Sequence, residues 1–412
     1  MSARRKHATP RVTVLDVRLG GDTIGTLTHL PGELTHFAFT DEYIEDPRRP
    51  ILSLSFKSAM GGLVTRHRPA RVKLPPFFSN LLPEGHLREY LAGRGNVHPD
   101  REFFLLWLLG QDLPGAVVVR PTAGAALPPT ASAEPRSAAT AGELLRFSLA
   151  GLQLKFSALM EMDGGLTVPA HGVGGAWIVK LPSARYAAVP ENEYVMLELA
   201  RAVSIEVPEV RLVPTDGIAG LPRGLPATFG PALAVRRFDR GPGGRRIHIE
   251  DFAQVFGVYP HRKYARASYQ DIARVLWAET GEAGIAEFTR RLAFSALIGN
   301  GDMHLKNWSL RYPDGRTAEL APAYDFVATV AYLPDATMAL SLAGTKAMTD
   351  VTADRFARFA ARAALPVRLV VDTALETAER LRAAWRKSEV VKTLPRELRS
   401  RVAAHLKAVP LR

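Results

Sequence analysis

Residues 297–310 constrain the fold of this chain more than any other segment. An apolar stretch, residues 288–298, runs into them and predicts a buried helix. The helix should end in an abrupt turn, because a glycine stands on each side of Asn300 and glycine permits the backbone angles of tight turns. Asp302 follows this turn, and Asn307 comes five residues later. The sequence therefore predicts a carboxylate and an amide on one short loop at the end of a buried helix.

The spacing of Asp302 and Asn307 is that of a protein-kinase catalytic loop. In such a loop the aspartate takes the proton of the acceptor hydroxyl and the asparagine holds magnesium. Asp325 stands 23 positions after Asp302 and precedes Phe326, where a kinase would place its Asp-Phe-Gly metal ligand. Phosphoryl transfer needs such groups because positioning and charge neutralisation stabilise most of its transition state. We therefore expect Asp302 to be a catalytic base and Asn307 and Asp325 to be metal ligands.

The Asp302 loop also has a structural interpretation. An aspartate and an asparagine at this spacing occur together by chance, and their side chains could cap the next element. His304 and Lys306 lie in the same loop and Asp325 follows downstream, so we favour the functional interpretation. His304 has no histidine or cysteine partner at ligand spacing, which favours a structural or nucleotide-contacting role over metal binding.

The net charge and the lack of cysteine limit the kinds of protein that this chain can be. Without cysteine there is no disulfide, no thiolate metal site and no cysteine nucleophile, which fits a cytoplasmic location. No apolar run approaches the ~18 residues that cross a bilayer, and the basic N-terminus lacks a following apolar region, so we expect neither a membrane segment nor a signal peptide. The net charge of +12 favours acidic partners such as nucleic acid, although a composition rich in arginine, alanine and proline explains it equally well.

The 412 residues predict two or three domains. Residues 1–120 begin with a hairpin pattern and continue into helical segments, which predicts a small α+β subdomain. Residues 121–142 are rich in Ala, Pro, Ser and Thr and predict a flexible linker. Residues 143–245 read as strand-rich, and residues 246–412 as mainly helical apart from the short catalytic and metal-binding segments. This order predicts an α+β, bilobal protein-kinase-like fold.

One lysine of the strand-rich lobe is a candidate for phosphate binding. Lys180 lies in an apolar strand, from which a lysine either reaches solvent or points at phosphates. Glu193, Leu197 and Ala200 share one face of the following helix. An acidic residue on an apolar face needs a partner, and Lys180 would serve.

Residues 147–155 are a candidate for a turn that covers phosphates. Gly151 permits close backbone approach, and Gln153 and Lys155 supply donors. The segment lacks the Gly-x-Gly-x-x-Gly pattern of ordinary protein kinases, and the sequence contains no Walker A pattern.

Ordered motifs along most of the chain resemble one family. The chain is similar to the HipA-type serine/threonine kinases, which are the toxin half of bacterial toxin–antitoxin pairs. The similarity rests on residues 77–85, 109–116, 148–155, 178–182, 191–194, 236–240, 250–254, 302–307 and 321–325.

The resemblance implies ATP and Mg²⁺ as cofactors, with Asp302 as the general base and with Asn307 and Asp325 at the metal. Lys180 would contact the phosphates, residues 236–238 would hold the adenine through their backbone, and Tyr324 would line the pocket. The implied ATP-binding residues are Ala150, Gly151, Leu152, Gln153, Leu154, Lys155, Lys180, Arg236, Arg237, Phe238, Asp239, His304, Lys306, Asn307, Tyr324 and Asp325.

The resemblance also implies a regulatory site. Ser148 falls where the family autophosphorylates and thereby switches itself off, although by spacing alone Ser148 reads as an ordinary turn serine. Leu154 stands where the family commonly has an acidic residue beside its lysine. This departure bears on the mobility of the turn, whereas Lys155 and the backbone donors for ATP remain.

The partners that the resemblance implies are a helix-turn-helix antitoxin similar to HipB, DNA through or alongside that antitoxin, and a bacterial protein substrate, for which an aminoacyl-tRNA synthetase is the family precedent. Two alternatives stay open from the residues. The chain could act chiefly as a DNA-bound co-repressor subunit with weak catalysis, which the charge of +12 fits. It could also phosphorylate a small metabolite. Phosphoserine or phosphothreonine on a polypeptide would distinguish a protein kinase from a metabolite kinase.

Overall fold

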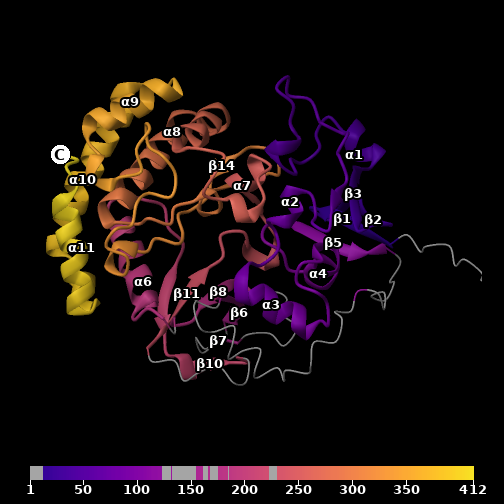
Figure 1. The fold of residues 1–412 in the computed structure, drawn as a ribbon, viewed down its shortest axis with the longest axis horizontal. Coiled ribbons are helices and arrows are strands. Elements are labelled where there is room, and N and C mark those ends of the chain that lie inside the picture. The colour runs from indigo at the N-terminus through magenta and orange to yellow at the C-terminus, as the bar shows by residue number, and fades with distance from the viewer. Residues whose placement is uncertain are drawn as a thin grey trace, which may run out of the picture.

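The described part of the chain contains three β-sheets, each with associated helices, and ends in a set of C-terminal helices. The computed structural model describes residues 13–122, 131, 155–160, 166–167, 175–183, 185–221 and 230–412. Figure 1 shows the N-terminal sheet, in indigo, and the last helices, in yellow, on opposite sides of the molecule. The middle sheet lies below and between them in this view.

The N-terminal sheet has the strand order β4-β3-β2-β1-β5. β1 and β2 form the antiparallel hairpin that the sequence predicts, with Gly20 and Gly21 at its turn. Leu15, Val17 and Leu19 point from alternate positions of β1 into the core. The elements of this unit are β1 (Thr13–Leu19), β2 (Asp22–Leu30), β3 (Leu34–Phe39), α1 (Asp41–Glu45), β4 (Ala70–Arg71), α2 (Pro76–Ser79), α3 (Gly85–Arg94), α4 (Glu102–Leu109) and β5 (Val117–Pro121).

The middle sheet has the strand order β10-β7-β6-β8-β11-β9. Its elements are β6 (Lys155–Met160), β7 (Leu166–Thr167), β8 (Trp177–Lys180), α6 (Val189–Ala202), β9 (Val210–Val213), β10 (Ile218–Ala219) and β11 (Ala232–Arg236). They confirm the strand predicted around Lys180 and the helix predicted around Glu193. β8 lies between β6 and β11, and its register places Lys180 directly opposite Lys155.

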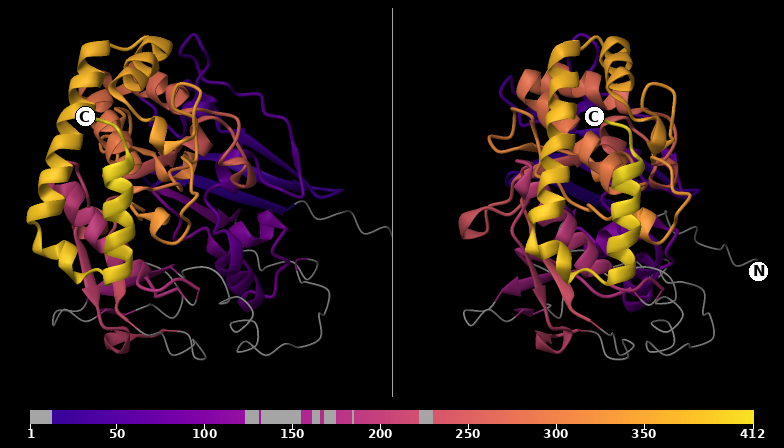
Figure 2. Two further views of the ribbon diagram at one scale, coloured as in Figure 1. Left: turned by 60° about the vertical axis from the view of Figure 1, so that its left-hand side comes forward. Right: turned by 90° about the vertical axis from the view of Figure 1, so that its left-hand side faces the viewer.

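The C-terminal part contains the predicted helices and a small sheet that the prediction did not include. The helices are α7 (Phe252–Val255), α8 (Tyr269–Ile298), α9 (Ala353–Ala363), α10 (Val367–Lys387) and α11 (Arg396–Ala408). The antiparallel sheet consists of β12 (His248–Asp251), β13 (Ser309–Tyr312) and β14 (Glu319–Leu320). Strands this short carry too little periodicity to be recognised in a sequence. Figure 2 shows α10 and α11 side by side on one outer face. Among the described residues, none of the helices combines the length and the apolar character that crossing a membrane requires.

Helix α8 sets the position of the Asp302 loop. At its start the Ser268 backbone N–H and hydroxyl both donate to the carboxylate of Asp271, at 2.8 and 2.7 Å. At its end Gly299 adopts a φ of 73°, in the left-handed region. A β-carbon at Gly299 would come within 2.3 Å of Val330 Cγ1, so only glycine fits this abrupt end of the helix.

Buried Glu250 joins the N-terminal unit to the small sheet. Its carboxylate accepts hydrogen bonds from the Ser53 hydroxyl (2.5 Å), the Leu54 N–H (3.0 Å) and the Tyr312 hydroxyl (2.5 Å). Burial raises the pKa of Glu250 to about 7, although these donors act in the opposite direction. The folded chain therefore holds the proton of Glu250 more tightly than the unfolded chain does.

This shift predicts a pH-dependent stability. The pKa of Glu250 in the folded chain lies above its ordinary value of 4.5. The stabilisation that Glu250 gives to the folded chain is therefore fully present below about pH 4.5 and is lost as the pH rises through about 7. The shift in pKa corresponds to roughly 3 kcal/mol in the free energy of unfolding. Glu250→Gln cannot titrate, so its unfolding temperature should fall less than that of the wild type between about pH 4.5 and about pH 8.

Thermal unfolding of both proteins across this range measures the difference. Asp251, whose pKa burial raises to about 6, contributes in the same direction in both proteins, so the variant keeps part of the slope. Identical pH profiles for the two proteins would show that Glu250 does not titrate in this way.

Candidate active site

A chain of hydrogen bonds holds the Asp302 loop, defined here as residues 299–307. The side-chain oxygen of Asn300 accepts from the Asp302 N–H at 3.0 Å, and its amide nitrogen donates to the backbone carbonyl of Asp325 at 3.2 Å. The amide nitrogen of Asn307 donates to the backbone carbonyl of Asp302 at 2.8 Å. The structure thus brings together the three residues that the sequence selects as base and metal ligands.

Asp325 combines a strained backbone with an ion-paired carboxylate. Its φ of 56° lies in the left-handed region, which is uncommon for residues other than glycine and often marks functional sites. Its carboxylate accepts from the Lys155 ammonium at 3.1 and 3.2 Å, and also from the Lys180 ammonium. Although burial favours the neutral acid, Lys155 and Lys180 hold the pKa of Asp325 below its usual range. The carboxylate is therefore ionised at neutral pH.

The pairing of Lys180 with Glu193 that the sequence predicts is present. The side chains are 4% and 1% exposed, and the Lys180 ammonium donates to both Glu193 and Asp325. Although burial opposes the charge, the carboxylates of Asp325 and Glu193 raise the pKa of Lys180. Glu193 therefore fixes a charged lysine beside Asp325.

Tyr264, which the sequence analysis did not select, contacts the candidate base. Its hydroxyl donates to Asp302 Oδ1 at 2.5 Å, and its ring meets that of His304 edge-on at 5.0 Å between centroids. The Tyr264 residue is 46% exposed. A hydroxyl bonded to Asp302 is the arrangement that a general base makes with the group that it deprotonates.

Lys306 connects the Asp302 loop to the N-terminal unit. Its ammonium lies 2.7 Å from Glu84 Oε1 and donates to the Asn80 carbonyl at 3.2 Å. Lys263 donates to the other oxygen of Glu84 at 2.9 Å. Although burial favours the neutral acid, Lys306 and Lys263 lower the pKa of Glu84 to about 2. The structure thus places Lys306 in an interdomain ion-pair cluster, not in the Asp325 cluster.

His304 and Tyr324 both lie close to the Asp302 loop. Burial lowers the pKa of His304 to about 4, so its ring is neutral, and its Nδ1 has no hydrogen-bond partner within the described part of the chain. The Tyr324 hydroxyl donates to the Lys306 carbonyl at 2.8 Å and lies 2.6 Å from the Ser309 hydroxyl. The Tyr324 ring lies 5.6 Å from the Phe238 ring, which brings the predicted adenine-binding segment next to the loop.

The residues predicted to surround the adenine divide between two environments. Arg236 is exposed at the end of β11 and lies 3.5 Å from Glu209. The backbone N–H and carbonyl of Phe238 have no hydrogen-bond partner among the described residues. Arg237 and Asp239, by contrast, form a buried ion pair at 2.8 Å, and Asp239 also accepts from the Gly115 N–H at 2.8 Å. The structure therefore places Arg237 and Asp239 at the boundary with the N-terminal unit, apart from the Asp325 cluster.

The described residues fit a nucleotide bound with Mg²⁺. Asp325 and Asn307 offer the oxygen ligands that Mg²⁺ prefers, and the oxygen of Asn307 is the atom left for a ligand because its nitrogen is bound to Asp302. Mg²⁺ commonly keeps several water ligands and takes phosphate oxygens together with one or two protein oxygens, which these two side chains can supply. Ser148 and residues 150–154, the rest of the predicted phosphate turn, lie outside the described residues.

Three residues of the site were missed in the sequence. Tyr264 precedes Asp302 by 38 positions and stands in a segment without periodicity, so nothing signals their contact. Glu84 and Lys263 pair across 179 positions. Glu84 belongs to a motif of the family resemblance, but that motif does not reveal which cations it meets.

The chain is similar to known proteins over nearly its whole length. A family model described as the HipA-like C-terminal domain matches residues 147–385, and one described as the HipA N-terminal domain matches residues 15–120. A Sinorhizobium fredii protein named "Putative kinase Y4dM" is 56% identical over 382 residues, which cover 91% of this chain and 92% of that protein. The Shewanella oneidensis serine/threonine-protein kinase toxin HipA is 26% identical and covers 94% of this chain and 92% of its own.

A solved structure has the same fold. A chain of the Shewanella oneidensis complex of HipA, HipB and operator DNA matches with a TM-score of 0.70 at 23% identity, over 96% of this chain and 95% of that chain. This match confirms the predicted α+β, bilobal kinase-like fold. The two family models and the Sinorhizobium relative establish the wider relationship, and the chain belongs to the HipA family.

Proposed function

We propose that this chain is a protein kinase that transfers the γ-phosphate of ATP, in the presence of Mg²⁺, to a serine or threonine of a bacterial protein. The observation that supports this most is the cluster of Asp325 with Lys155 and Lys180, joined through Asn300 to the loop that bears Asp302. A metal-binding carboxylate, two phosphate-binding cations and a general base thus form one hydrogen-bonded unit. Positioning and charge neutralisation of this kind are the main sources of catalysis in phosphoryl transfer.

Asp302 has the role of proton acceptor in this proposal. It accepts a hydrogen bond from Tyr264 in the structure and would accept one from the substrate hydroxyl during the reaction. Asp325 and Asn307 would hold Mg²⁺, which when bound neutralises charge on the phosphates. The bond from Asn307 to the Asp302 carbonyl keeps the base and the metal ligand at a fixed separation.

Lys180 has the role of phosphate ligand. Glu193 and Asp325 hold its ammonium in the structure, and a phosphate oxygen of ATP would be a further acceptor for it beside Asp325. Lys155 would contact the phosphates in the same way from the adjacent strand. The backbone groups of Phe238, which have no hydrogen-bond partner among the described residues, would bind the adenine edge, with the Tyr324 ring beside them.

The toxin role and the partners are part of the same proposal. The Shewanella relative bears the name of a kinase toxin, and its structure was solved with HipB and operator DNA. We infer that this chain pairs with a HipB-like helix-turn-helix antitoxin in the cytoplasm and approaches DNA through it, which the net charge of +12 favours. Co-purification of the chain with the product of an adjacent helix-turn-helix gene tests the pairing. A chain that binds no such protein and no operator DNA would contradict it.

One experiment tests the kinase assignment. The wild-type chain and Asp302→Ala are each incubated with Mg²⁺, γ-labelled ATP and a soluble bacterial extract. Phosphoserine or phosphothreonine peptides that appear only with the wild type would support the proposal and name the substrate. Label on a small metabolite alone would support the metabolite-kinase alternative, and no labelled product would contradict both.

Self-inactivation through Ser148 yields a further prediction, which rests on the family resemblance because Ser148 lies outside the described residues. A phosphate on Ser148 would add roughly −1.5 to −2 charge beside the ATP phosphates and Asp325. Like-charge repulsion should expel the turn and weaken ATP binding. Mass spectrometry after incubation with MgATP should find a phosphorylated form of the wild type that Ser148→Ala lacks.

The phosphorylated and unmodified wild-type proteins should then differ in their affinity for ATP, measured by calorimetry. Purified phosphoprotein is the better sample, because Ser148→Asp carries only about one negative charge. Equal affinities for ATP would show that phosphorylation of Ser148 does not regulate ATP binding, and Ser148 would then be an ordinary turn residue.

A further inference from the structure

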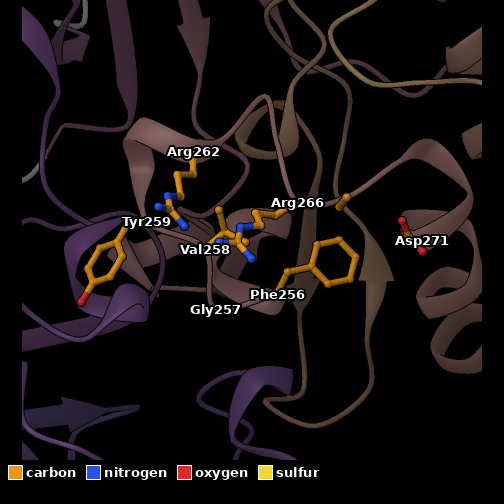
Figure 3. Close-up of a pocket in the computed structure, with 8 residues that line it drawn as sticks. Phe256, Gly257, Val258, Tyr259, Arg262, Arg266 and Asp271 are labelled. Atoms are coloured by element: carbon orange, nitrogen blue, oxygen red, sulfur yellow. The ribbon is translucent and has the colours of Figure 1, made fainter. Parts of the chain in front are cut away.

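A pocket lies along the segment that joins α7 to α8, and Lys263 and Tyr264 of this segment contact the Asp302 loop. Its volume of about 490 Å³ is in the range of ligand-binding sites. Figure 3 shows the side chains of Arg262 and Arg266 pointing toward the same space near Val258, with Tyr259 and Phe256 to either side. Two guanidinium groups of one turn thus converge on a concave surface, which we call the basic pocket.

The basic pocket has an excess of positive charge. Arg262 and Arg266 are exposed, and neither side chain has a carboxylate or a hydrogen-bond acceptor among the described residues. Asp271 also lines the pocket, but its carboxylate is engaged by the Ser268 cap and by Arg274 at 2.8 Å. Like charges in one concavity repel each other unless an anion lies between them, so the pocket suits an acidic ligand.

The turn that carries the two arginines is fixed to the Asp302 loop. The Leu305 N–H donates to the Lys263 carbonyl at 3.2 Å, and the Lys263 ammonium is held by Glu84. Arg266 has a φ of 75°, a strained conformation for a residue other than glycine that persists only where the surroundings impose it. The backbone that carries the two arginines therefore has a defined place relative to the candidate base.

Tyr264 shows how close that place is to the acceptor. It stands two residues from each arginine, so its α-carbon lies at most about 7 Å from theirs, and its side chain spans the remaining distance to Asp302. Its hydroxyl donates to Asp302, as the hydroxyl of an acceptor would. A peptide whose serine or threonine replaced the Tyr264 hydroxyl at Asp302 would bring its neighbouring side chains to the basic pocket.

We propose that the basic pocket binds acidic side chains that flank the phosphorylated residue of the acceptor protein. The proposal rests on the protein-kinase function proposed above and names the substrate class that this function would use. Charge complementarity with Arg262 and Arg266 provides the selectivity, and the bidentate geometry of arginine favours carboxylates. The segment that lines the pocket also carries Tyr264, whose hydroxyl contacts Asp302, which favours a substrate segment over a nucleic acid as the occupant.

Binding of two labelled peptides to the full-length chain tests the proposal without catalysis. One peptide has a serine flanked by glutamates, and the other has glutamines in their place. Fluorescence anisotropy should show that the wild type binds the glutamate peptide about tenfold more tightly, with a difference that shrinks as salt is added. The double variant Arg262→Glu/Arg266→Glu should bind both peptides equally.

The matched control is Arg358→Glu/Arg368→Glu. It makes the same change in net charge on the exposed faces of α9 and α10 and should keep the wild-type preference. Equal unfolding temperatures of the two double variants verify that both are folded. Loss of the preference in the control, or its persistence in the pocket variant, would overturn the assignment of the pocket.

Phosphate transfer to the same peptides separates this inference from the proposed function. The pocket variant should raise KM for the glutamate peptide about tenfold while KM for MgATP stays unchanged. Transfer to both peptides with equal KM in the wild type would overturn the pocket proposal alone, and no transfer despite selective binding would overturn the kinase function alone. A short RNA that binds the pocket more tightly than the glutamate peptide, and loses this affinity in the pocket variant, would reassign the pocket to nucleic acid.

Discussion

Replacement of Asp302 by alanine should lower the rate of phosphoryl transfer by about 10²-fold or more, the range expected when a positioned general base is removed. The affinity for MgATP should stay close to that of the wild type. Asp302 accepts from the Tyr264 hydroxyl through its carboxylate, whereas within the described residues its connection to Asp325 runs through its backbone and Asn300, so its carboxylate is available to the acceptor. Steady-state kinetics with the acceptor protein or peptide measure the rate of phosphoryl transfer, and calorimetric titration measures the affinity for MgATP.

The control for this variant is Asp22→Ala. Asp22 is an exposed carboxylate at the turn between β1 and β2 of the N-terminal sheet, so its loss makes the same change in charge away from the site and should leave the rate unchanged. Asp302→Asn adds a second comparison, because it keeps the shape of the side chain and can still accept the bond from Tyr264. Turnover at the wild-type rate in both Asp302 variants would remove Asp302 from the role of base.

The parts of the site that the sequence predicts are those set by local pattern. The apolar run of α8 ends at a glycine, which fixes where the Asp302 loop must begin. Lys180 and Glu193 each stand on an apolar element, where a charged side chain is costly without a partner, so their pairing follows from periodicity and burial. Functional residues whose position follows from the spacing and periodicity of one segment can therefore be predicted without a structure.

The parts that the sequence does not predict depend on contacts between distant segments. Lys306 and Glu84 pair across the boundary between the N-terminal unit and the Asp302 loop, and Asp239 turns toward Gly115 in the same way. A charged residue in a loop has many possible partners of opposite sign, and only the packing of the domains selects one. The hydrogen bond from Tyr264 to Asp302 is another such contact, because Tyr264 is a loop residue and only the tertiary structure determines its neighbour.

Replacement of Asp325 by asparagine should abolish Mg²⁺-dependent ATP turnover or lower it by about 10²-fold to 10³-fold, the loss expected when a charged group at the transferring phosphate is removed. The amide lacks the anionic oxygen that Mg²⁺ requires. MgATP affinity should weaken as well, in contrast to the Asp302 variants. Because Lys155 and Lys180 hold the pKa of Asp325 below its usual range despite burial, the wild-type carboxylate stays ionised, and its MgATP affinity should not change near neutral pH on account of this residue.

The structure also predicts why Asp325→Asn should remain folded. Lys180 keeps its buried partner Glu193, so the substitution leaves no buried charge without a counter-ion. Glu193→Gln is the informative comparison, because it removes the partner of Lys180 without touching a metal ligand and should weaken ATP binding whether Mg²⁺ is present or absent. Asp325→Asn should instead remove the enhancement of ATP affinity that Mg²⁺ provides. Calorimetric titrations of both variants with ATP, with and without Mg²⁺, separate the two effects, and an undiminished Mg²⁺ dependence in Asp325→Asn would assign Asp325 to a purely structural role.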